Sequence, residues 1–189
     1  MKSNKLVFFD FDGVIVDSFD VWFDILKDIR DFETVEDFKA HYDGSVYRND
    51  KDGKTGKIDK TTTKAFDEFH ERKSETPVVA EVRDEILKLA KDYDMVIVSS
   101  TVSNTIKDHL RLLEIKKCFK EVLGSDFHKS KTYKFNYALD KFMVLAENAI
   151  LVTDTLGDIR EASEANIRSI GVTWGFHERE RLEKGKPWA

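Results

Sequence analysis

The sequence has little that would point to an exported, membrane-bound or nucleic-acid-binding protein. Cys118 is the only cysteine, so this chain alone can form neither an intrachain disulfide nor a zinc site made of cysteines, which favours a reducing compartment. The apolar run at 6–9 is stopped by Asp10 and is too short for a signal-peptide core or a membrane span. The formal net charge of -5 and the pI near 5.6 supply no concentrated basic face. We therefore expect a cytoplasmic protein that binds a small molecule, and neither nucleic acid nor a membrane.

The length and composition are those of a folded α/β protein. A chain of 189 residues can bury one core and carry a small accessory module, but not two full domains. Hydrophobic residues make up 41% and charged residues 35%, far from the composition of disordered chains. The sequence contains no repeat and no low-complexity tract.

Short apolar runs alternate with amphipathic stretches along most of the chain. The runs at 5–9, 94–99, 119–124, 148–153 and 168–172 are typical of strands buried on both faces, and the third is the weakest. Helical patterns are predicted at 82–93, 103–114, 132–146 and 156–165. This alternation predicts an α/β fold with a doubly wound parallel sheet and right-handed crossovers.

Residues 17–77 do not follow this alternation of strands and helices. They contain no convincing buried strand but do contain amphipathic stretches, such as the one with Phe19, Trp22 and Leu26. We interpret this segment as a helical insert, with a polar, glycine-rich loop at 43–56 as its tip or as a hinge. Pro77 marks the return to the core, because proline moves the preceding residue out of the helical region.

Two carboxylates, Asp10 and Asp12, directly follow the first predicted strand. Residues i and i+2 of an extended segment point to the same side, so these side chains are expected to crowd together at the carboxyl end of the strand, where ligands bind in open α/β sheets. A metal ion or a shared proton would relieve their repulsion. Taken alone, the pair is also compatible with one turn-capping aspartate and one solvated aspartate.

A second acidic pair follows another predicted strand. Asp154 stands at the strand end and Asp158 in the first turn of the next helix, where the helix dipole alone would already favour it. Beside the first pair, Asp154 would add an oxygen ligand of the kind magnesium prefers. The hydroxyls of Ser99 and Ser100 lie at the end of the strand predicted at 94–99 and could bind an anion. Serine also commonly closes strands and caps helices without binding a ligand.

The ordered set of these residues is more specific than any one of them. It comprises Asp10-Phe11-Asp12-Gly13-Val14 with Asp17-Ser18, then Ser99, then a lysine, then Asp154-Thr155-Leu156-Gly157-Asp158. This order resembles the four motifs of the haloacid dehalogenase-like superfamily, in its phosphoglycolate phosphatase-like branch. The resemblance covers residues 5–175, and its first motif is highly specific. It implies a Rossmann-type core at 1–16 and 78–189, with a helical cap inserted at 17–77.

The resemblance also implies catalytic and metal-binding roles. Asp10 would attack phosphorus, and Asp12 would be the general acid and base. Magnesium would be held by the Asp10 carboxylate, the Asp12 backbone carbonyl and Asp154, with Asp158 acting directly or through water. The expected activity is magnesium-dependent hydrolysis of a small phosphomonoester through an aspartyl-phosphate intermediate, by a monomer or small homo-oligomer.

The remaining roles concern the phosphoryl group. Ser99 would bind its oxygens, with Ser100 and Gly13 as further substrate-binding residues, and a lysine would steady both Asp10 and the substrate charge. The family's lysine is usually followed by proline, which is absent here, so two candidates remain. Spacing from the following helix favours Lys129, whereas nearness to the helix start favours Lys131, which we prefer.

One further departure from the family concerns the metal site. Thr153 replaces the glycine usual before Asp154, and we expect its branched side chain to narrow the pocket.

Other activities remain open within the same fold. A sugar phosphomutase would differ in its cap residues, and a dehalogenase would not need Asp12, Asp154 and Asp158. From other classes, a phospho-receiver module or a non-catalytic phosphate-binding protein are alternatives, but a receiver carries no insert of this length.

Overall fold

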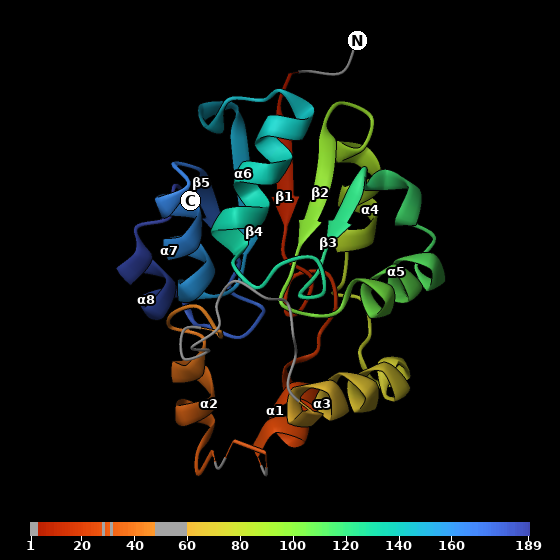
Figure 1. Ribbon diagram of the computed structural model, residues 1–189, viewed down its shortest axis with the longest axis vertical. Coiled ribbons are helices and arrows are strands. Elements are labelled where there is room, and N and C mark those ends of the chain that lie inside the picture. Colours follow the sequence, from red (N-terminus) through yellow and green to blue (C-terminus); the bar gives the residue numbers. More distant parts are fainter. Residues whose placement is uncertain (1–3, 28, 31, 48–59) are drawn as a thin grey trace.

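The computed structural model describes residues 4–27, 29–30, 32–47 and 60–189. Its centre is a five-stranded sheet with helices on both faces, and further helices gather beyond one end of the sheet (Figure 1). The strands are β1 (Leu6–Phe9), β2 (Asp94–Val98), β3 (Glu121–Leu123), β4 (Ala149–Thr153) and β5 (Arg168–Gly171). They pair in parallel in the order β3-β2-β1-β4-β5. The predicted doubly wound α/β class is confirmed.

The helices fall into two groups along the chain. The insert contains α1 (Phe19–Lys27), α2 (Val35–His41) and α3 (Lys60–Glu71), and the core contains α4 (Val82–Leu89), α5 (Ser103–Leu112), α6 (Lys131–Phe142), α7 (Leu156–Glu164) and α8 (Arg179–Leu182). The prediction of a helix at 132–146 was too long, because Met143 adopts the left-handed conformation (φ 55°) that ends α6. Within the described residues, no helix combines the length and the apolar character needed to span a bilayer.

The two faces of the sheet are buried under different helices. Phe8 of β1 faces α6, where its ring packs against Phe135 with a centroid separation of 5.0 Å. Its neighbour Phe9 points to the opposite face, which also carries Ile86 of α4 and Ile106 of α5. Each fully buried Phe contributes about 1.5–3 kcal/mol of transfer free energy. Successive side chains of β1 thus pack against the helix layers on opposite faces of the sheet. Asp10 follows directly at the carboxyl end of the strand.

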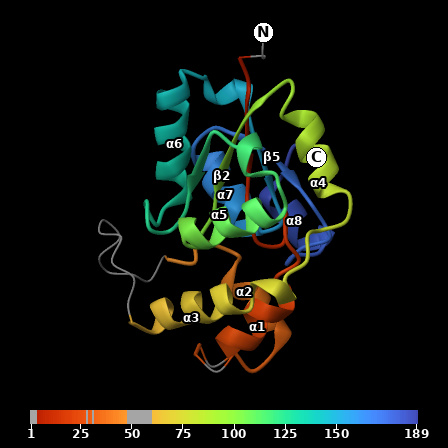
Figure 2. The same cartoon turned by 90° about the vertical axis from the view of Figure 1, so that its right-hand side faces the viewer.

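The helices of the insert lie beyond the carboxyl ends of the strands, and both views agree on this placement (Figures 1 and 2). The two segments that connect the insert to the core run side by side: the Asp17 amide donates to the Pro77 carbonyl at 2.8 Å, and Val16 pairs with Val78 in an antiparallel bridge. Of the loop predicted at 43–56, only residues 43–47 lie within the described part of the chain.

The segment formed by α2 and the turn after it is attached directly to the core. The Gly157 amide at the start of α7 donates to the Tyr42 carbonyl at 2.9 Å, and a His177 ring nitrogen lies 2.9 Å from the Lys39 carbonyl. The approach requires glycine at 157, because a Cβ there would lie 2.5 Å from the Gly44 carbonyl oxygen. Any opening of the insert as one body must therefore break these contacts.

Candidate active site

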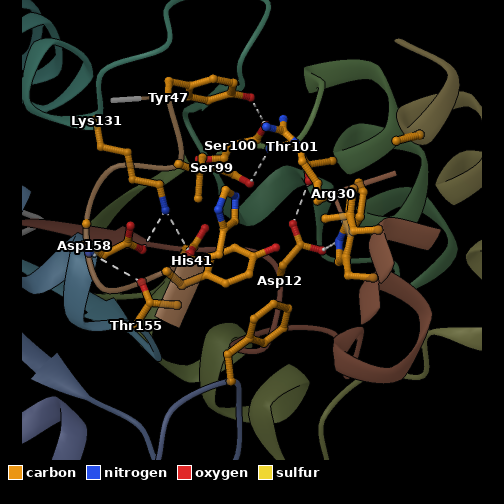
Figure 3. A pocket seen from close by; sticks show the side chains of 18 of the residues that line it. Asp12, Arg30, His41, Tyr47, Ser99, Ser100, Thr101, Lys131, Thr155 and Asp158 are labelled. Carbon is orange, nitrogen blue, oxygen red and sulfur yellow. Dashed lines mark hydrogen bonds and ion pairs between the residues drawn. The ribbon is translucent and has the colours of Figure 1, made fainter. Parts of the chain in front are cut away.

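A cavity of about 90 Å³ lies between the carboxyl ends of β1, β2 and β4 and the insert (Figure 3). Its core wall is polar and is formed by Asp10, Asp12, Ser99, Ser100, Thr101, Lys131, Thr155, Asp158 and Glu161. Its opposite wall is mainly apolar and aromatic and includes Trp22, Leu26, Ile29, Tyr42, Val46, Tyr47, Ala65 and Phe66, with Arg30 and His41. The cavity thus presents charged and hydroxyl groups on one side and a largely apolar surface on the other.

Asp10 stands at the end of β1 and is almost fully buried. Its backbone is held against the neighbouring strand, because its amide donates to the Val152 carbonyl of β4 at 2.9 Å. One carboxylate oxygen accepts the Phe11 amide at 2.7 Å, and the other lies 2.9 Å from the Lys131 Nζ. Burial raises the pKa of Asp10 well above its usual range, Lys131 opposes this rise, and the nearby carboxylate of Asp158 adds to it.

Lys131 is brought to the site by the first turn of α6. Its Nζ lies between two carboxylates, 2.9 Å from Asp10 and 2.6 Å from Asp158. A dashed line in Figure 3 marks the ion pair between Lys131 and Asp158. Burial lowers the pKa of Lys131, but the charges of the two aspartates outweigh this effect and raise it, so the ammonium is the stable form. Lys129 instead lies over the Tyr47 ring, with its Nζ 5.5 Å from the centroid. Of the two predicted candidates, Lys131 is the lysine that contacts Asp10.

Asp158 begins α7, where the Thr155 hydroxyl accepts its amide at 3.4 Å. Its Oδ2 receives two donors, the Lys131 Nζ and the Thr153 hydroxyl at 2.7 Å. Burial alone would raise the pKa of Asp158, but Lys131 and these hydrogen bonds lower it. Thr153 is fully buried and is not among the residues that line the cavity. The expectation that Thr153 narrows the pocket was wrong, because its hydroxyl turns toward Asp158.

Asp154 follows β4 and is fully buried. Its Oδ2 accepts the Phe176 amide at 2.7 Å, whereas its Oδ1 has no hydrogen-bond partner among the described residues. Burial raises the pKa of this carboxyl to about 7. Gly13 packs against it with φ +69°, and a Cβ there would lie 2.0 Å from the Asp154 Oδ2. Gly13 therefore does not line the cavity; it makes room for this carboxylate.

The Asp12 carboxylate is held by three hydrogen-bond donors from three parts of the chain. Its Oδ1 accepts the Ser18 hydroxyl at 2.9 Å and the Trp22 indole N–H at 2.8 Å, while its Oδ2 accepts the Thr101 hydroxyl at 2.7 Å. Trp22 belongs to α1, so a helix of the insert contacts this carboxylate directly. Sequence reasoning treated Trp22 only as part of an apolar face, because the amphipathic pattern carries no signal for its indole N–H.

The segment after β2 brings Ser99 and Ser100 to the cavity. The Ser99 Oγ accepts the Thr101 amide at 3.0 Å, which turns the loop tightly at the end of the strand. The Ser100 carbonyl accepts the Tyr47 hydroxyl of the insert at 2.9 Å. A second residue that sequence reasoning missed is Lys134, which bonds to the Ser99 carbonyl from behind.

The crowded carboxylates fit a divalent cation. The charges of Asp154 and Asp158 raise the pKa of Asp10, and the charge of Asp158 also raises the pKa of Asp154. The Asp154 Oδ1, which has no hydrogen-bond partner among the described residues, is an oxygen that a cation would satisfy. Within the described residues, no three acidic, histidine or cysteine side chains already surround a single point as a metal cage. Magnesium usually takes only one or two protein carboxylates and keeps several waters, so this donor set suits it.

Comparison with known proteins identifies the family. Residues 7–172 match the haloacid dehalogenase-like hydrolase family. The chain belongs to this family. A phosphoglycolate phosphatase of Colwellia psychrerythraea is 26% identical over 210 residues, with 100% of this chain and 93% of that protein covered. A phosphoglycolate phosphatase of Vibrio cholerae is 27% identical over 128 residues, with 65% and 57% covered.

The solved structures agree with the fold of a haloacid dehalogenase-like hydrolase. A predicted phosphatase from Clostridium acetobutylicum matches with a TM-score of 0.75 and 22% identity, over 97% of this chain and 91% of that chain. The chain spans about half the length of the Vibrio relatives that it matches, at 57% for Vibrio cholerae and 56% for Vibrio parahaemolyticus. The resemblance to the phosphoglycolate phosphatase-like branch, inferred from the motifs, is confirmed.

Proposed function

We propose that this member of the family is a magnesium-dependent phosphomonoester hydrolase in which Asp10 is transiently phosphorylated. The observation that carries the proposal is the position of the Lys131 Nζ, between the Asp10 and Asp158 carboxylates at the polar end of the cavity. A cation fixed there would attract the phosphoryl oxygens toward Asp10 and offset the repulsion between two anions.

In the proposed site, Asp10, Asp154 and the Asp12 backbone carbonyl hold magnesium, with Asp158 bound directly or through water. The unpartnered Asp154 Oδ1 and the clustered carboxylates support this assignment. When bound, the ion would neutralise charge on the carboxylates and on the phosphoryl oxygens. Because metal ions bind the ionised carboxylates, the raised pKa of Asp154 makes the affinity pH-dependent.

The proposed reaction has two halves. An Asp10 oxygen bonds to phosphorus as the bond from phosphorus to the leaving-group oxygen breaks, and Asp12 gives its proton to that oxygen. A water molecule then attacks the phosphorus of the aspartyl phosphate, Asp12 takes the water's proton, and free phosphate and the Asp10 carboxylate are regenerated. Ser99 and Ser100 bind the phosphoryl oxygens in both halves. Residues 17–77 act as the cap that excludes bulk water during this sequence.

The substrate is proposed to be a small phosphorylated metabolite. The names of the Colwellia and Vibrio relatives make phosphoglycolate the first compound to test. The guanidinium of Arg30 lines the cavity from the insert and makes no hydrogen bond or ion pair with a described residue, so it is available to an anionic leaving group. The predicted cytoplasmic location and the monomeric or small homo-oligomeric state belong to the same proposal.

The proposal is tested by a screen of phosphomonoesters with and without magnesium. The panel includes phosphoglycolate, sugar phosphates and nucleoside monophosphates, with released phosphate as the readout. We expect hydrolysis that a chelator abolishes, and beryllium fluoride bound at Asp10 as a mimic of the aspartyl phosphate. Full activity in the chelator would exclude the metal site. Conversion of a sugar phosphate to its isomer without phosphate release would identify a phosphomutase instead.

A further inference from the structure

Lys134 is a buried lysine to which the proposed mechanism gives no role. It lies in α6, one turn after Lys131, and its side chain is fully buried. Burial, together with the nearby charge of Lys131, lowers the pKa of Lys134 to about 7. Burying a lysine without a carboxylate partner is unfavourable, so its presence needs an explanation in the groups that it contacts.

The contacts of Lys134 are two backbone carbonyls at the ends of neighbouring strands. Its Nζ donates to the Ser99 carbonyl after β2 at 2.6 Å and to the Gly124 carbonyl after β3 at 3.3 Å. No described carboxylate forms an ion pair with it. Lys134 therefore ties the carboxyl ends of two strands together behind the residues proposed to bind phosphate.

These contacts determine how the peptide between Ser99 and Ser100 is oriented. The described chain contains no cis peptide bond, and in a trans peptide the C=O and the following N–H point in opposite directions. The Ser99 C=O points to Lys134, which is not among the residues that line the cavity, whereas Ser99 and Ser100 both line it. The Ser100 N–H must point the other way, and it makes no hydrogen bond to any described residue.

We propose that Lys134 is a positioning residue: it holds the Ser99 carbonyl so that the Ser100 N–H points at the phosphoryl group of the substrate. This inference rests on the proposed phosphatase function and adds a residue to it. A backbone N–H fixed before the substrate arrives needs no reorganisation during the reaction. The Lys134 Nζ reaches both carbonyls because it offers several N–H donors at the end of a long side chain. An apolar side chain of similar shape would fill most of the space but would not hold the Ser99 carbonyl.

The test compares Lys134→Met with Lys141→Met. Methionine keeps the unbranched shape of the lysine side chain as far as its ε position and removes the ammonium group with its donors. Lys141 is on the same helix but bonds to Glu121 at 2.8 Å with its side chain 45% exposed, so its replacement is a matched control. Calorimetry with inorganic phosphate and magnesium, together with kcat and KM for the best substrate, gives the readouts. We expect phosphate binding about tenfold weaker and kcat/KM at least about tenfold lower in Lys134→Met, with wild-type values in the control.

A folded Lys134→Met protein with wild-type phosphate affinity would overturn the inference while leaving the phosphatase proposal intact. If that variant does not fold, the wild-type protein still decides the matter. Its Ser100 amide proton should shift downfield in an NMR titration with phosphate and magnesium. Phosphate binding that shifts the Asp10 and Asp12 amides but not the Ser100 amide would refute the positioning role. A wild-type protein that neither binds phosphate nor hydrolyses any ester would instead refute the proposed function, and this inference with it.

Discussion

The contact between the insert and Asp12 allows a sharp prediction for Trp22→Phe. The substitution removes the indole N–H that lies 2.8 Å from the Asp12 Oδ1 but keeps an aromatic ring stacked on Phe69, whose centroid is 4.3 Å away. In the step that is tested Asp12 acts as a neutral acid, and a hydrogen bond between neutral groups contributes about 0.5–1.5 kcal/mol. We take the upper end of this range because the 2.8 Å contact is partly buried, and this value corresponds to roughly tenfold in rate.

The assay uses two aryl phosphates of similar size, phenyl phosphate and 4-nitrophenyl phosphate. Phenolate is a poor leaving group and needs a proton from Asp12, whereas 4-nitrophenolate leaves without one. The value of kcat/KM reports on the first chemical half even if breakdown of the aspartyl phosphate limits turnover. In Trp22→Phe we expect kcat/KM to fall about tenfold more for phenyl phosphate than for 4-nitrophenyl phosphate.

A control separates loss of the hydrogen bond from a general change in the insert. Phe66 packs edge-on against Trp22, with a centroid separation of 5.8 Å, and also lines the cavity, but its hydrocarbon ring offers no donor to Asp12. Phe66→Leu should therefore lower kcat/KM by the same factor for both esters. If Trp22→Phe also affects the two esters equally, the indole N–H does not position Asp12 and the reasoning is refuted.

Three further predictions concern the carboxylates of the site. Asp10→Asn should abolish turnover and leave the circular dichroism spectrum unchanged, and a folded variant with wild-type activity would exclude Asp10 as the nucleophile. Because burial raises the pKa of Asp154 from 3.8 to about 7, the folded state retains this proton more strongly than the unfolded state. The chelated protein should thus lose stability as the pH rises from about 4 to about 7, and Asp154→Asn should flatten this part of the Tm profile and weaken magnesium binding; an unchanged profile would contradict the shift. Thr153→Val removes one of the two donors to the Asp158 Oδ2, so it should weaken magnesium binding measured by calorimetry by about threefold to tenfold, whereas Thr153→Ser should not. Equal affinities in the two Thr153 variants would show that the hydroxyl has no such role.

Local sequence patterns alone determined the sheet and the position of its acidic residues. The run at 6–9 before Asp10 is apolar at every position, which is typical of a strand buried on both faces, and the structure has that strand as β1. Asp154 follows β4 for the same reason, and β1 and β4 pair in parallel, so the two carboxyl ends meet at one edge. Such information is local, since a buried strand and the charge that ends it are adjacent in the chain.

The partners of these carboxylates were decided only by the tertiary structure. Lys129 and Lys131 are two residues apart, and spacing along the chain supported either one. The choice depends on the phase of α6 and on Glu161 of α7, which accepts the Lys131 amide at 2.9 Å and so fixes where the helix begins relative to the sheet. In the same way, nothing near Trp22 in the sequence indicates Asp12 as its acceptor, and Lys134 resembles any surface lysine until two strand ends are placed beside it. Hydrogen bonds between separate elements depend on how those elements pack against each other. Residue type and periodicity within a single element do not indicate this packing, so they could not predict these contacts.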